Sequence, residues 1–587
     1  MGHPSLHNVM EICKAELLNI IQNLNKERCV DFIPTEDCDS KYLGEFEGTV
    51  MLSKNESVQL AIAFTAHFPL SLPDIFIKEN EAFRAHVGVG GKICLFDSSS
   101  ILINQELVDQ LVIDCFDQAI KILNIRPGSK IYNDEVCREF DSYWLSVLNK
   151  KTYSCLDTHD VKYAEFPMVV SKGVSVIANT KIEAEIILRN TFGLMPDENT
   201  FERTCIVVRI RDGSNMIPLS KQFKWNNIRR YVVDNTSSSV KRQFRKFLDK
   251  KVKHYVRYLL LVYPAKEGDV LFGFRIEFNN NRYGKIENSL PTKVENVFVE
   301  RIDYQYLTMR GGGTATLKDK HVLLLGCGSV GGYIASNLCQ SGILKIDILD
   351  NDFFNPENVH RHWLGFDSIS PKEYKYKADL VKEKLEAQYP YADIDSLNFM
   401  DRNAETFIKD EKRLAHYDLI ISALGEPTIN LEINRIIRAN SIACPFLCCF
   451  NEPYGIGGHI VAINLDRNSC LQCLYTDSIS NELVPFRGSF AAPNQSFKKN
   501  ISGCSSAFVP YNSLDSQQTA ILATRKVIDI LNGCLTRNTL FSWIGSPESY
   551  ISQGYILSEI YLANKDKGTM YFDNFTNTNC RICGQKH

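Results

Sequence analysis

The sequence predicts a multidomain protein of mixed α and β structure, with an α+β unit, a mixed α/β region and a parallel α/β domain in succession. Its 587 residues are too many for one hydrophobic core, which favours two to four domains. The periodicity also changes along the chain. Residues 42–77 alternate as short strands between helical stretches, whereas from His321 a strand, a glycine-rich turn, a helix and a strand follow in order. We therefore expect domains over residues 1–150, 151–305 and 306–587.

The composition is that of an ordinary folded protein, with 44% hydrophobic and 23% charged residues. A formal net charge of -3 gives no reason to expect nucleic-acid or membrane binding. No stretch has the pattern of a signal segment or the length of a membrane span. We therefore expect a cytoplasmic protein whose 19 cysteines are reduced, most of them as small buried hydrophobic residues.

The first unit has the order helix, strand meander, loop, helix. Apolar residues at helical spacing begin it, short strands then alternate around a turn at Lys54, and two prolines bound the loop that precedes the last strand. The expected helices cover residues 7–25 and 105–123, and the expected strands cover 43–52, 57–66 and 74–77.

The region from residue 155 to 305 contains the strand-like runs TCIVVRI, YLLLVYP and VLFGFRIEF between polar loops. Its conspicuous feature is the basic stretch Lys241 to Arg257. We interpret this stretch as a solvated helix face rather than as a docking patch for a partner. No catalytic pattern is visible here, and the sequence leaves the role of the region open.

The stretch HVLLLGCGSVGG predicts a nucleotide-binding turn. A buried strand leads into Gly326, Gly328 and Gly331, a helix follows, and a second strand ends at Asp350. Glycines allow a tight turn and a close approach of backbone to phosphates at the helix N-terminus, and an acidic residue at this place can bind a ribose hydroxyl. A dehydrogenase would satisfy these features equally well.

The residues after Asp350 favour ATP. Asp352 is followed by NPENVHRHWL, in which Asn358 and Arg361 are three apart and should share a helix face, and Lys377 opens the next helix. This pattern resembles the family of MoeB, ThiF and the ubiquitin-activating enzymes, whose adenylation domain has a Rossmann-like fold. The resemblance implies that Asp350 holds the ribose of ATP and that the other three side chains bind the triphosphate. Cations there would stabilise the charge that develops when a carboxylate attacks the α-phosphate.

Two further positions follow from the resemblance. The family has an aspartate that positions Mg²⁺ where this chain has Gly425, so either Glu426 or Asp352 would take that role. An arginine near the start of the domain reaches the γ-phosphate in the family, across the interface of a dimer, and Arg310 in TMRGGG is the candidate here. The resemblance therefore implies ATP, Mg²⁺ and a homodimer.

Two C-x-x-C pairs predict a zinc site. Cys470 and Cys473 form one pair, and Cys580 and Cys583 form the other. Four thiolates complete a tetrahedral site for Zn²⁺, which would fasten the C-terminal tail to the sheet. The MoeB-like family has the same distant pairing.

A polar loop between the two pairs contains Cys504, which follows Lys498 and Lys499 and precedes a helix expected from about Ser513. Positive charge and a helix start lower the pKa of a thiol and make it a better nucleophile. In activating enzymes a loop at this place carries the cysteine that accepts the adenylated carboxylate as a thioester. The alternative is a half-buried loop cysteine.

The N-terminal unit also carries a cysteine motif, HVGVGGKICLF, with Cys94 at its end. The order of elements and this motif resemble a ubiquitin-conjugating domain, in which Cys94 would carry the acyl group. His86 matches the histidine of the family's His-Pro-Asn signature, but Val87 and Gly88 replace the proline and the asparagine. In that family the asparagine stabilises the oxyanion, so the resemblance implies that another donor takes its place here or that the chemistry differs.

A conjugating domain in front of an activating domain resembles the bacterial E2–E1 fusion proteins of CBASS anti-phage systems. The resemblance implies activation of the C-terminus of a cGAS-like nucleotidyltransferase, a thioester on Cys504, transfer to Cys94 and conjugation to an amine on a target. Two alternatives remain open. One is a MoeB- or ThiF-like biosynthetic activator of a sulfur-carrier protein, for which Cys94 would be dispensable. The other is a non-catalytic scaffold that binds the partner.

Overall fold

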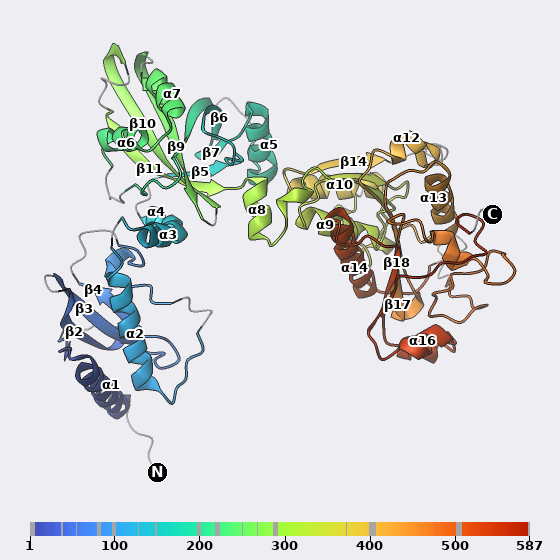
Figure 1. Cartoon of the computed structure of the whole chain (residues 1–587), viewed down its shortest axis with the longest axis horizontal. Helices are drawn as coiled ribbons and strands as arrows, with labels where there is room; N and C mark the ends of the chain where they lie inside the picture. The colour runs from blue at the N-terminus through green and yellow to red at the C-terminus, as the bar shows by residue number, and fades with distance from the viewer. Residues whose placement is uncertain are drawn as a thin grey trace. The chain divides into compact units, whose positions relative to one another are not determined.

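The computed structural model describes residues 6–36, 39–53, 56–78, 84–96, 101–126, 128–146, 150–195, 201–217, 223–248, 251–266, 268–285, 291–370, 372–397, 407–499 and 508–584. The chain divides into two compact units (Figure 1). One contains Met1–Glu185 and Met195–Ile302, and the other contains Ile186–Leu194 and Asp303–His587. No described helix combines the length and the apolar character that crossing a membrane requires.

The N-terminal part of the first unit packs two helices on a four-stranded antiparallel sheet of order β1-β2-β3-β4. Helix α2 buries Val112, Cys115, Phe116 and Ala119, which recur at the helical spacing that places side chains on one face. The apolar positions of α1 do the same. The elements are α1 (Leu6–Arg28), β1 (Ile33–Pro34), β2 (Tyr42–Ser53), β3 (Glu56–Thr65), β4 (Asp74–Ile77), α2 (Val108–Leu123), α3 (Lys130–Arg138) and α4 (Phe140–Ser146).

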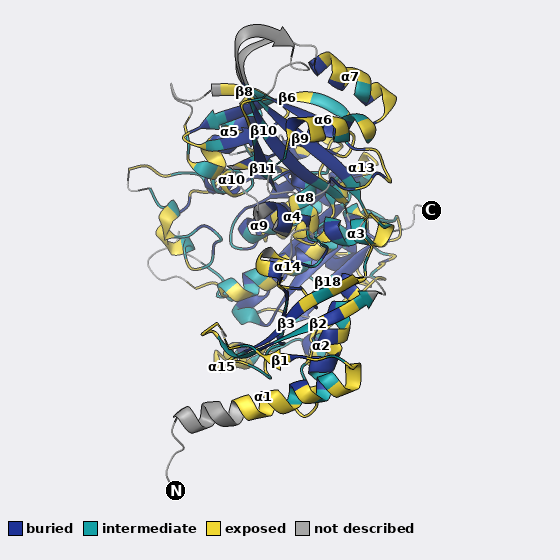
Figure 2. Ribbon diagram, turned by 90° about the vertical axis from the view of Figure 1, so that its left-hand side faces the viewer, coloured by how far each residue is buried: buried dark blue, intermediate teal, exposed yellow. Residues whose placement is uncertain are grey.

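The middle of the chain is a closed barrel of order β10-β11-β5-β7-β6-β8-β9. In Figure 2 its long strands β9 and β10 are largely buried, whereas α7 shows an exposed outer face. The elements are β5 (Lys150–Ser154), β6 (Tyr163–Ser171), β7 (Val174–Ile177), α5 (Lys181–Phe192), β8 (Phe201–Arg209), α6 (Trp225–Asp234), α7 (Ser238–Leu248), β9 (Lys251–Ala265), β10 (Gly268–Lys285) and β11 (Lys293–Arg301).

The basic stretch from Lys241 spans two elements and not one helix. In α7 Phe244 and Phe247 are buried, while Arg242 and Arg245 are exposed on the opposite side. Lys251, Lys253 and Arg257 of the same stretch lie in β9. The interpretation as a solvated helix face therefore describes α7, and the stretch as a whole continues into a barrel strand.

The second unit is built on an eight-stranded sheet of order β14-β13-β12-β15-β16-β17-β18-β19. Pairing from β14 to β16 is parallel, and from β16 to β19 it is antiparallel. Val322 and Leu324 of β12 enter one apolar core, and Leu323 and Leu325 enter the other, so both faces of the sheet are covered. The strands are β12 (His321–Leu325), β13 (Lys345–Leu349), β14 (Asp393–Leu397), β15 (Leu419–Ser422), β16 (Phe446–Asn451), β17 (Gly457–Ile463), β18 (Thr539–Ile544) and β19 (Thr569–Phe572).

Helices cover this sheet on its two faces. Residues of α9, α10 and α14 contribute to the core on one face, and residues of α13 contribute to the core on the other. The helices are α8 (Tyr304–Arg310), α9 (Gly331–Gln340), α10 (Lys377–Gln388), α12 (Glu411–Leu414), α13 (Pro427–Ala439), α14 (Ser513–Leu531), α15 (Glu548–Ser552) and α16 (Glu559–Asn564).

Candidate nucleotide and acyl-transfer sites

The glycine-rich turn and Asp350 lie at one edge of the large sheet. Leu325 at the end of β12 pairs with Leu349 of β13 on one side and with Ser422 of β15 on the other. Gly326 and Asp350 therefore leave the sheet next to each other. In open α/β sheets ligands bind beyond the carboxyl ends of the strands, where the strand order reverses, and β12 is such a strand.

The glycine-rich turn needs its glycines for two different reasons. Gly326 has a φ of 82°, in the left-handed region that other residues avoid. A Cβ on Gly331 would lie 1.9 Å from the carbonyl oxygen of Gly326, so only glycine lets α9 start so close to the strand. By contrast, a Cβ on Gly328 would meet nothing within 4 Å. The backbone at Gly328 is thus open to an approaching phosphate.

Asp350 holds the turn in place through both carboxylate oxygens. Oδ2 accepts a hydrogen bond from the backbone N–H of Cys327 at 2.8 Å, and Oδ1 accepts one from the N–H of Asp352 at 2.8 Å. A carboxylate oxygen can accept a second hydrogen bond, so the predicted contact with a ribose hydroxyl is compatible with this capping role and stays a prediction.

Lys377 and Asp352 form an ion pair beside the turn. The Lys377 Nζ lies 3.0 Å from Oδ2 of Asp352, and the Lys377 N–H donates to the Asp352 carbonyl at 2.9 Å. Lys377 begins α10, as predicted, and its side chain is 10% exposed, whereas that of Asp352 is 74% exposed. The lysine is held in place by the fold, while the carboxylate partner faces outward and is available to a ligand.

Asn358 and Arg361 do not share an α-helix, which corrects the expectation from their spacing. Residues Pro356–Asn358 form a 3₁₀ turn, and the N–H of Arg361 donates to the Asn358 carbonyl at 3.0 Å. Arg361 lies beyond the end of this 3₁₀ turn, so the joint role of the two side chains stays a prediction. The Asn358 side-chain oxygen accepts from the N–H of Asn355 at 3.0 Å and fixes the start of the turn.

The Arg361 guanidinium lies over the ring of Tyr511, 5.6 Å from its centroid. The Tyr511 hydroxyl is in turn 3.0 Å from the Oγ of Ser329 in the glycine-rich turn. Tyr511 comes shortly before α14, and Tyr333 of α9 and Ser513 of α14 are joined by a further hydroxyl contact of 2.9 Å. The start of α14 is therefore fastened to the turn that precedes α9.

Sequence reasoning missed His362, which is buried next to Arg361. Its Nδ1 accepts from the N–H of Leu364 at 3.0 Å, and its Nε2 lies 2.5 Å from the carbonyl oxygen of Cys327. Only the neutral imidazole with its proton on Nε2 makes both bonds. Burial lowers the pKa of His362 to about 4 and keeps it neutral. A histidine in this context carries no motif that would have revealed it as a support for the turn.

The two remaining residues predicted for the nucleotide site are Arg310 and Glu426. Arg310 ends α8 with an exposed side chain, and α8 is fastened near the far end of α9 by a 2.6 Å bond from the Tyr304 hydroxyl to the Gly342 carbonyl. Glu426 is the exposed N-cap residue of α13, and Gly425 before it has a φ of 68°. The roles of Arg310 and Glu426 stay predictions.

Cys504 lies outside the described residues. Lys499 and Phe508, the described residues on either side of it, are joined by two backbone hydrogen bonds of 2.9 Å, one in each direction. The helix predicted from about Ser513 begins at that residue. Cys448 and Cys449 are buried in β16, as expected for most of the cysteines.

The four cysteines of the C-x-x-C pairs come together. Their sulfur atoms all lie within 4.8 Å of one another, with 3.7 Å between Cys470 and Cys580 and 3.2 Å between Cys473 and Cys583. Sulfur atoms bound tetrahedrally to Zn²⁺ at about 2.3 Å would be about 3.8 Å apart, so the donor set fits this ion. Asn577 fastens the second pair to the first through a 2.9 Å bond to the Thr476 carbonyl.

Cys94 is exposed at the end of the loop that His86 begins. The N–H of Cys94 donates to the His86 carbonyl at 2.7 Å. The His86 ring lies between two carboxylates, with Nδ1 2.6 Å from Glu139 and Nε2 3.0 Å from Glu135. The structure therefore brings together the two residues that the sequence singled out and adds an acidic pair that the sequence did not indicate.

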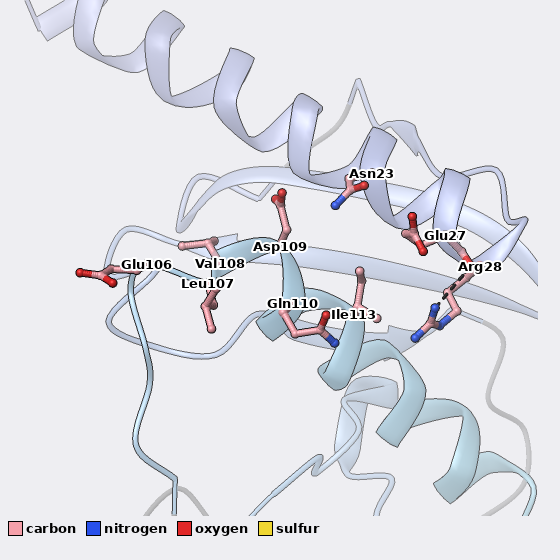
Figure 3. A pocket seen from close by; sticks show the side chains of 9 residues that line it. All are labelled: Asn23, Glu27, Arg28, Glu106, Leu107, Val108, Asp109, Gln110 and Ile113. Carbon is pink, nitrogen blue, oxygen red and sulfur yellow. Dashed lines mark hydrogen bonds between the residues drawn. The ribbon is translucent and has the colours of Figure 1, made fainter.

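A polar hollow of about 480 Å³ lies between α1 and the N-terminal end of α2. Figure 3 shows its lining, in which Arg28 faces the hollow. The guanidinium of Arg28 makes two 2.7 Å bonds to Asp117. None of its lining residues belongs to the predicted sites.

Two family models match the chain. The model of the ThiF family matches residues 303–536, and the model of prokaryotic E2 family B matches residues 34–153. The first contains the glycine-rich turn and Arg361, and the second contains Cys94. Along the sequence the two matches leave residues 154–302 between them, which contain most of the barrel.

Curated relatives include proteins named ATP-dependent ubiquitin transferase-like protein Cap2. The protein from Pseudomonas aeruginosa is 28% identical over 43% of this chain and 43% of its own length. The one from Vibrio cholerae is 28% identical over 38% of this chain and 37% of its own, and the one from Escherichia coli is 25% identical over 48% and 52%. The chain thus spans about half the length of the relatives that it matches.

A solved structure of Escherichia coli MccB aligns with 48% of this chain and 68% of that one at 15% identity. Its TM-score of 0.32 is too low for this likeness to support an argument. The assignment rests on the two family models and on the Cap2 proteins. The chain combines a segment that matches prokaryotic E2 family B with a segment that matches the ThiF family, and in this it is similar to the E2–E1 fusion proteins of the CBASS type.

Proposed function

We propose that this protein uses ATP to activate the C-terminal carboxylate of a partner protein and passes the acyl group to an amine through two cysteines. The observation that supports this most is the edge of the large sheet, where the open backbone at Gly328 lies in the same turn as the contacts of Asp350 and Tyr511. The guanidinium of Arg361 lies over the ring of Tyr511. A domain with a second candidate cysteine, Cys94, is part of the same chain.

In the first step a carboxylate oxygen of the partner attacks the α-phosphorus of ATP, and pyrophosphate leaves. Arg361 and Lys377 would stabilise the negative charge on the phosphates, and Asp350 would hold the ribose. Mg²⁺ would neutralise phosphate charge there, and the exposed carboxylates of Asp352 and Glu426 are the candidates to hold it.

In the next steps a Cys504 thiolate attacks the acyl carbon and AMP leaves, and the Cys94 thiolate then displaces Cys504 from the new thioester. An amine on the target finally forms the amide bond and releases Cys94. Thioesters suit such a relay because a good leaving thiolate makes the acyl group reactive towards amines. By analogy with the CBASS fusion proteins, the partner would be a cGAS-like nucleotidyltransferase and conjugation would prime it.

In this proposal the cysteine cluster is a structural metal site. Zn²⁺ held by Cys470, Cys473, Cys580 and Cys583 would fix the C-terminal tail against the sheet and take no part in the chemistry. A homodimer, in which Arg310 would reach the nucleotide of the other subunit, also belongs to this proposal.

The test uses ATP–pyrophosphate exchange and thioester formation, with a cGAS-like nucleotidyltransferase as the partner. We expect exchange with the unaltered chain and with Cys504→Ala, and a loss of about 100-fold or more with Arg361→Ala. Cys94→Ala should still form a reducible thioester on Cys504 but no stable conjugate. Exchange that persists in Arg361→Ala would refute the nucleotide site, and conjugation that persists in Cys94→Ala would refute the role of Cys94 as the acyl carrier.

A further inference from the structure

The loop that carries Cys94 is held by a chain of hydrogen bonds that the expected motif does not contain. The Cys94 N–H donates to the carbonyl of His86 at 2.7 Å, and the N–H of His86 donates to the hydroxyl of Tyr143 at 2.5 Å. The Tyr143 hydroxyl then donates to Oε2 of Glu139 at 2.5 Å. Three consecutive bonds thus lead from a carboxylate at the junction of α3 and α4 to the backbone of the candidate cysteine.

The imidazole of His86 also binds the carboxylate at which this series of hydrogen bonds begins. Its Nδ1 lies 2.6 Å from Oε1 of Glu139, so one carboxylate binds both the imidazole of His86 and the hydroxyl that holds the His86 backbone. The other ring nitrogen lies 3.0 Å from Glu135 on α3, which also pairs with Arg138 at 3.0 Å. Two carboxylate partners require two ring protons, so the arrangement fits the imidazolium form.

The backbone of His86 is in an uncommon conformation. Its φ is 58°, in the left-handed region, which costs a residue with a Cβ on the order of 1 kcal/mol. Such a conformation persists only where the surroundings fix it, and residues held in this way concentrate at functional sites. Here the ring contacts and the bond from the His86 N–H to Tyr143 are the contacts that fix it.

We infer that Tyr143 and Glu139 are positioning residues for Cys94 and, together with His86, form a clamp on the turn that presents the thiol. The inference rests on the proposed role of Cys94 as an acyl acceptor. Tyr143 is 4% exposed and packs into the domain, so its hydroxyl is held where the His86 N–H needs it. The clamp is absent from the His-Pro-Asn pattern and gives this loop a support of its own.

The clamp should depend on pH. The hydrogen bond with Glu139 is the largest cause of the raised pKa of His86, followed in the same direction by the charges of Glu139 and Glu135, while burial opposes them. The titratable groups that face the ring are those two carboxylates, and Tyr143 faces the backbone of His86. As pH rises through the pKa of His86, the ring loses a proton and one carboxylate loses its donor. The clamp is therefore complete at lower pH and loosens as pH rises.

The experiment measures amide hydrogen exchange of peptides from residues 84–96 in the full chain, at about pH 7 and about pH 9, corrected for the intrinsic rate. We expect protection that falls at the higher pH. Tyr143→Phe and Glu139→Gln should each lower protection at pH 7 by about tenfold or more. The first removes the hydroxyl that binds both Glu139 and the His86 N–H, and the second removes the charge that binds that hydroxyl and the imidazole of His86. Tyr263→Phe is the matched control, since Tyr263 is also buried and donates a hydroxyl bond, to Ser214 at 2.7 Å.

A second measurement asks whether the clamp matters for chemistry. The mesna thioester of N-acetylglycine serves as the acyl donor: the Cys94 thiolate attacks its carbonyl carbon, and mesna leaves as a thiolate. Peptide mass spectrometry follows the acylated Cys94, and Tyr143→Phe should slow its formation by about tenfold or more because misplacement of a reacting group is costly. Neither measurement uses ATP, so failure of adenylation leaves both intact.

Two results would overturn the inference. One is protection of residues 84–96 in Tyr143→Phe and Glu139→Gln equal to that of the unaltered chain. The other is an unchanged acylation rate of Cys94 despite faster exchange. If Tyr143→Phe also raises exchange in residues 42–65, the domain has unfolded, and Glu139→Gln, which keeps the size of the side chain, decides in its place.

Discussion

At the scale of single residues, the nucleotide site depends on side chains that bind no phosphate themselves in the proposed complex. They hold in place the side chains that would bind the phosphates. Tyr511 is one such residue, because its ring carries the Arg361 guanidinium and its hydroxyl reaches Ser329. A cation over an aromatic face gains on the order of 0.5–2 kcal/mol, depending on how far it is desolvated. Tyr511 therefore prepares Arg361 for a ligand with several negative charges.

Tyr511→Leu should weaken binding of ATP to the full chain by about three- to tenfold, because the platform beneath Arg361 is lost. Binding of AMP should change less, since AMP lacks the β- and γ-phosphates assigned to Arg361. Tyr511→Phe keeps the ring and serves as the matched variant, with affinity for ATP close to that of the unaltered chain. Calorimetric titration measures the affinity of each variant for ATP and for AMP. Equal losses for ATP and AMP in Tyr511→Leu would contradict the assignment.

His362 allows a prediction about pH. Its pKa lies at about 4 in the folded protein, below the ordinary value of 6.5, so between these values the unfolded chain binds a proton that the folded chain does not. Stability should therefore fall as pH drops from 6.5 towards 4, and the contribution of His362 is about 3 kcal/mol. In His362→Gln the fall in the free energy of unfolding, measured in urea across this range, should be smaller by about that amount.

The control for this prediction is His360→Gln, which changes an exposed histidine two positions away. The pH dependence of this variant should match that of the unaltered chain. If His362→Gln and His360→Gln flatten the pH dependence to the same degree, burial of His362 is not the cause.

At the scale of elements, the C-terminal tail is held by side chains rather than by a long strand. β19 pairs with β18 over only four positions, and the cysteine cluster follows it. Asn577 and the two C-x-x-C pairs then join residues that are about one hundred positions apart in the chain. We therefore expect the tail to be held less firmly when the cluster contains no Zn²⁺.

The purified protein should contain one Zn²⁺ per chain by mass spectrometry of the metal. Cys583→Ser should lower metal affinity by well over tenfold, since changes outside the ligand set alone cost about 10–100-fold. The same substitution should raise amide exchange in residues 574–584, because the pair Cys580 and Cys583 is then no longer held to the first pair. Cys534→Ser changes an exposed cysteine outside the cluster and should leave both properties unchanged. Full metal content in Cys583→Ser would argue against a four-cysteine site.

The elements that sequence could predict are those whose pattern is local. Alternating apolar residues located β2 and β3, and the start of α14 was found from a helical pattern after a polar loop. The closed barrel was not predicted, because its closure depends on which distant strands pair, such as β11 with β5. In the site, glycine spacing located the turn. The contacts of His362, Tyr511 and Glu139 join residues far apart in sequence, which no local pattern encodes.

At the scale of the whole molecule, one apolar core of the first unit extends across the end of the E2 family match. The E2 family model ends at residue 153, yet Phe140 and Trp144 of α4 lie in the same buried cluster as Phe272 and Phe274 of the barrel. The Trp144 indole N–H also donates to the Val297 carbonyl of β11 at 2.8 Å. Helix α4 is therefore shared by the E2 region and the barrel within the first unit.

A fragment that ends at residue 150 should consequently be less stable than one that ends at residue 302, because it exposes two aromatic side chains that are each 1% exposed in the full chain. In the full chain, Trp144→Ala should cost about 3–5 kcal/mol through the cavity that it leaves and the unpaired Val297 carbonyl. Amide exchange should then rise in the strands of the barrel, while peptides of residues 321–349 in the second unit keep their protection. A stable fragment of residues 1–150, with Trp144→Ala leaving barrel exchange unchanged, would show that the E2 domain folds without the barrel.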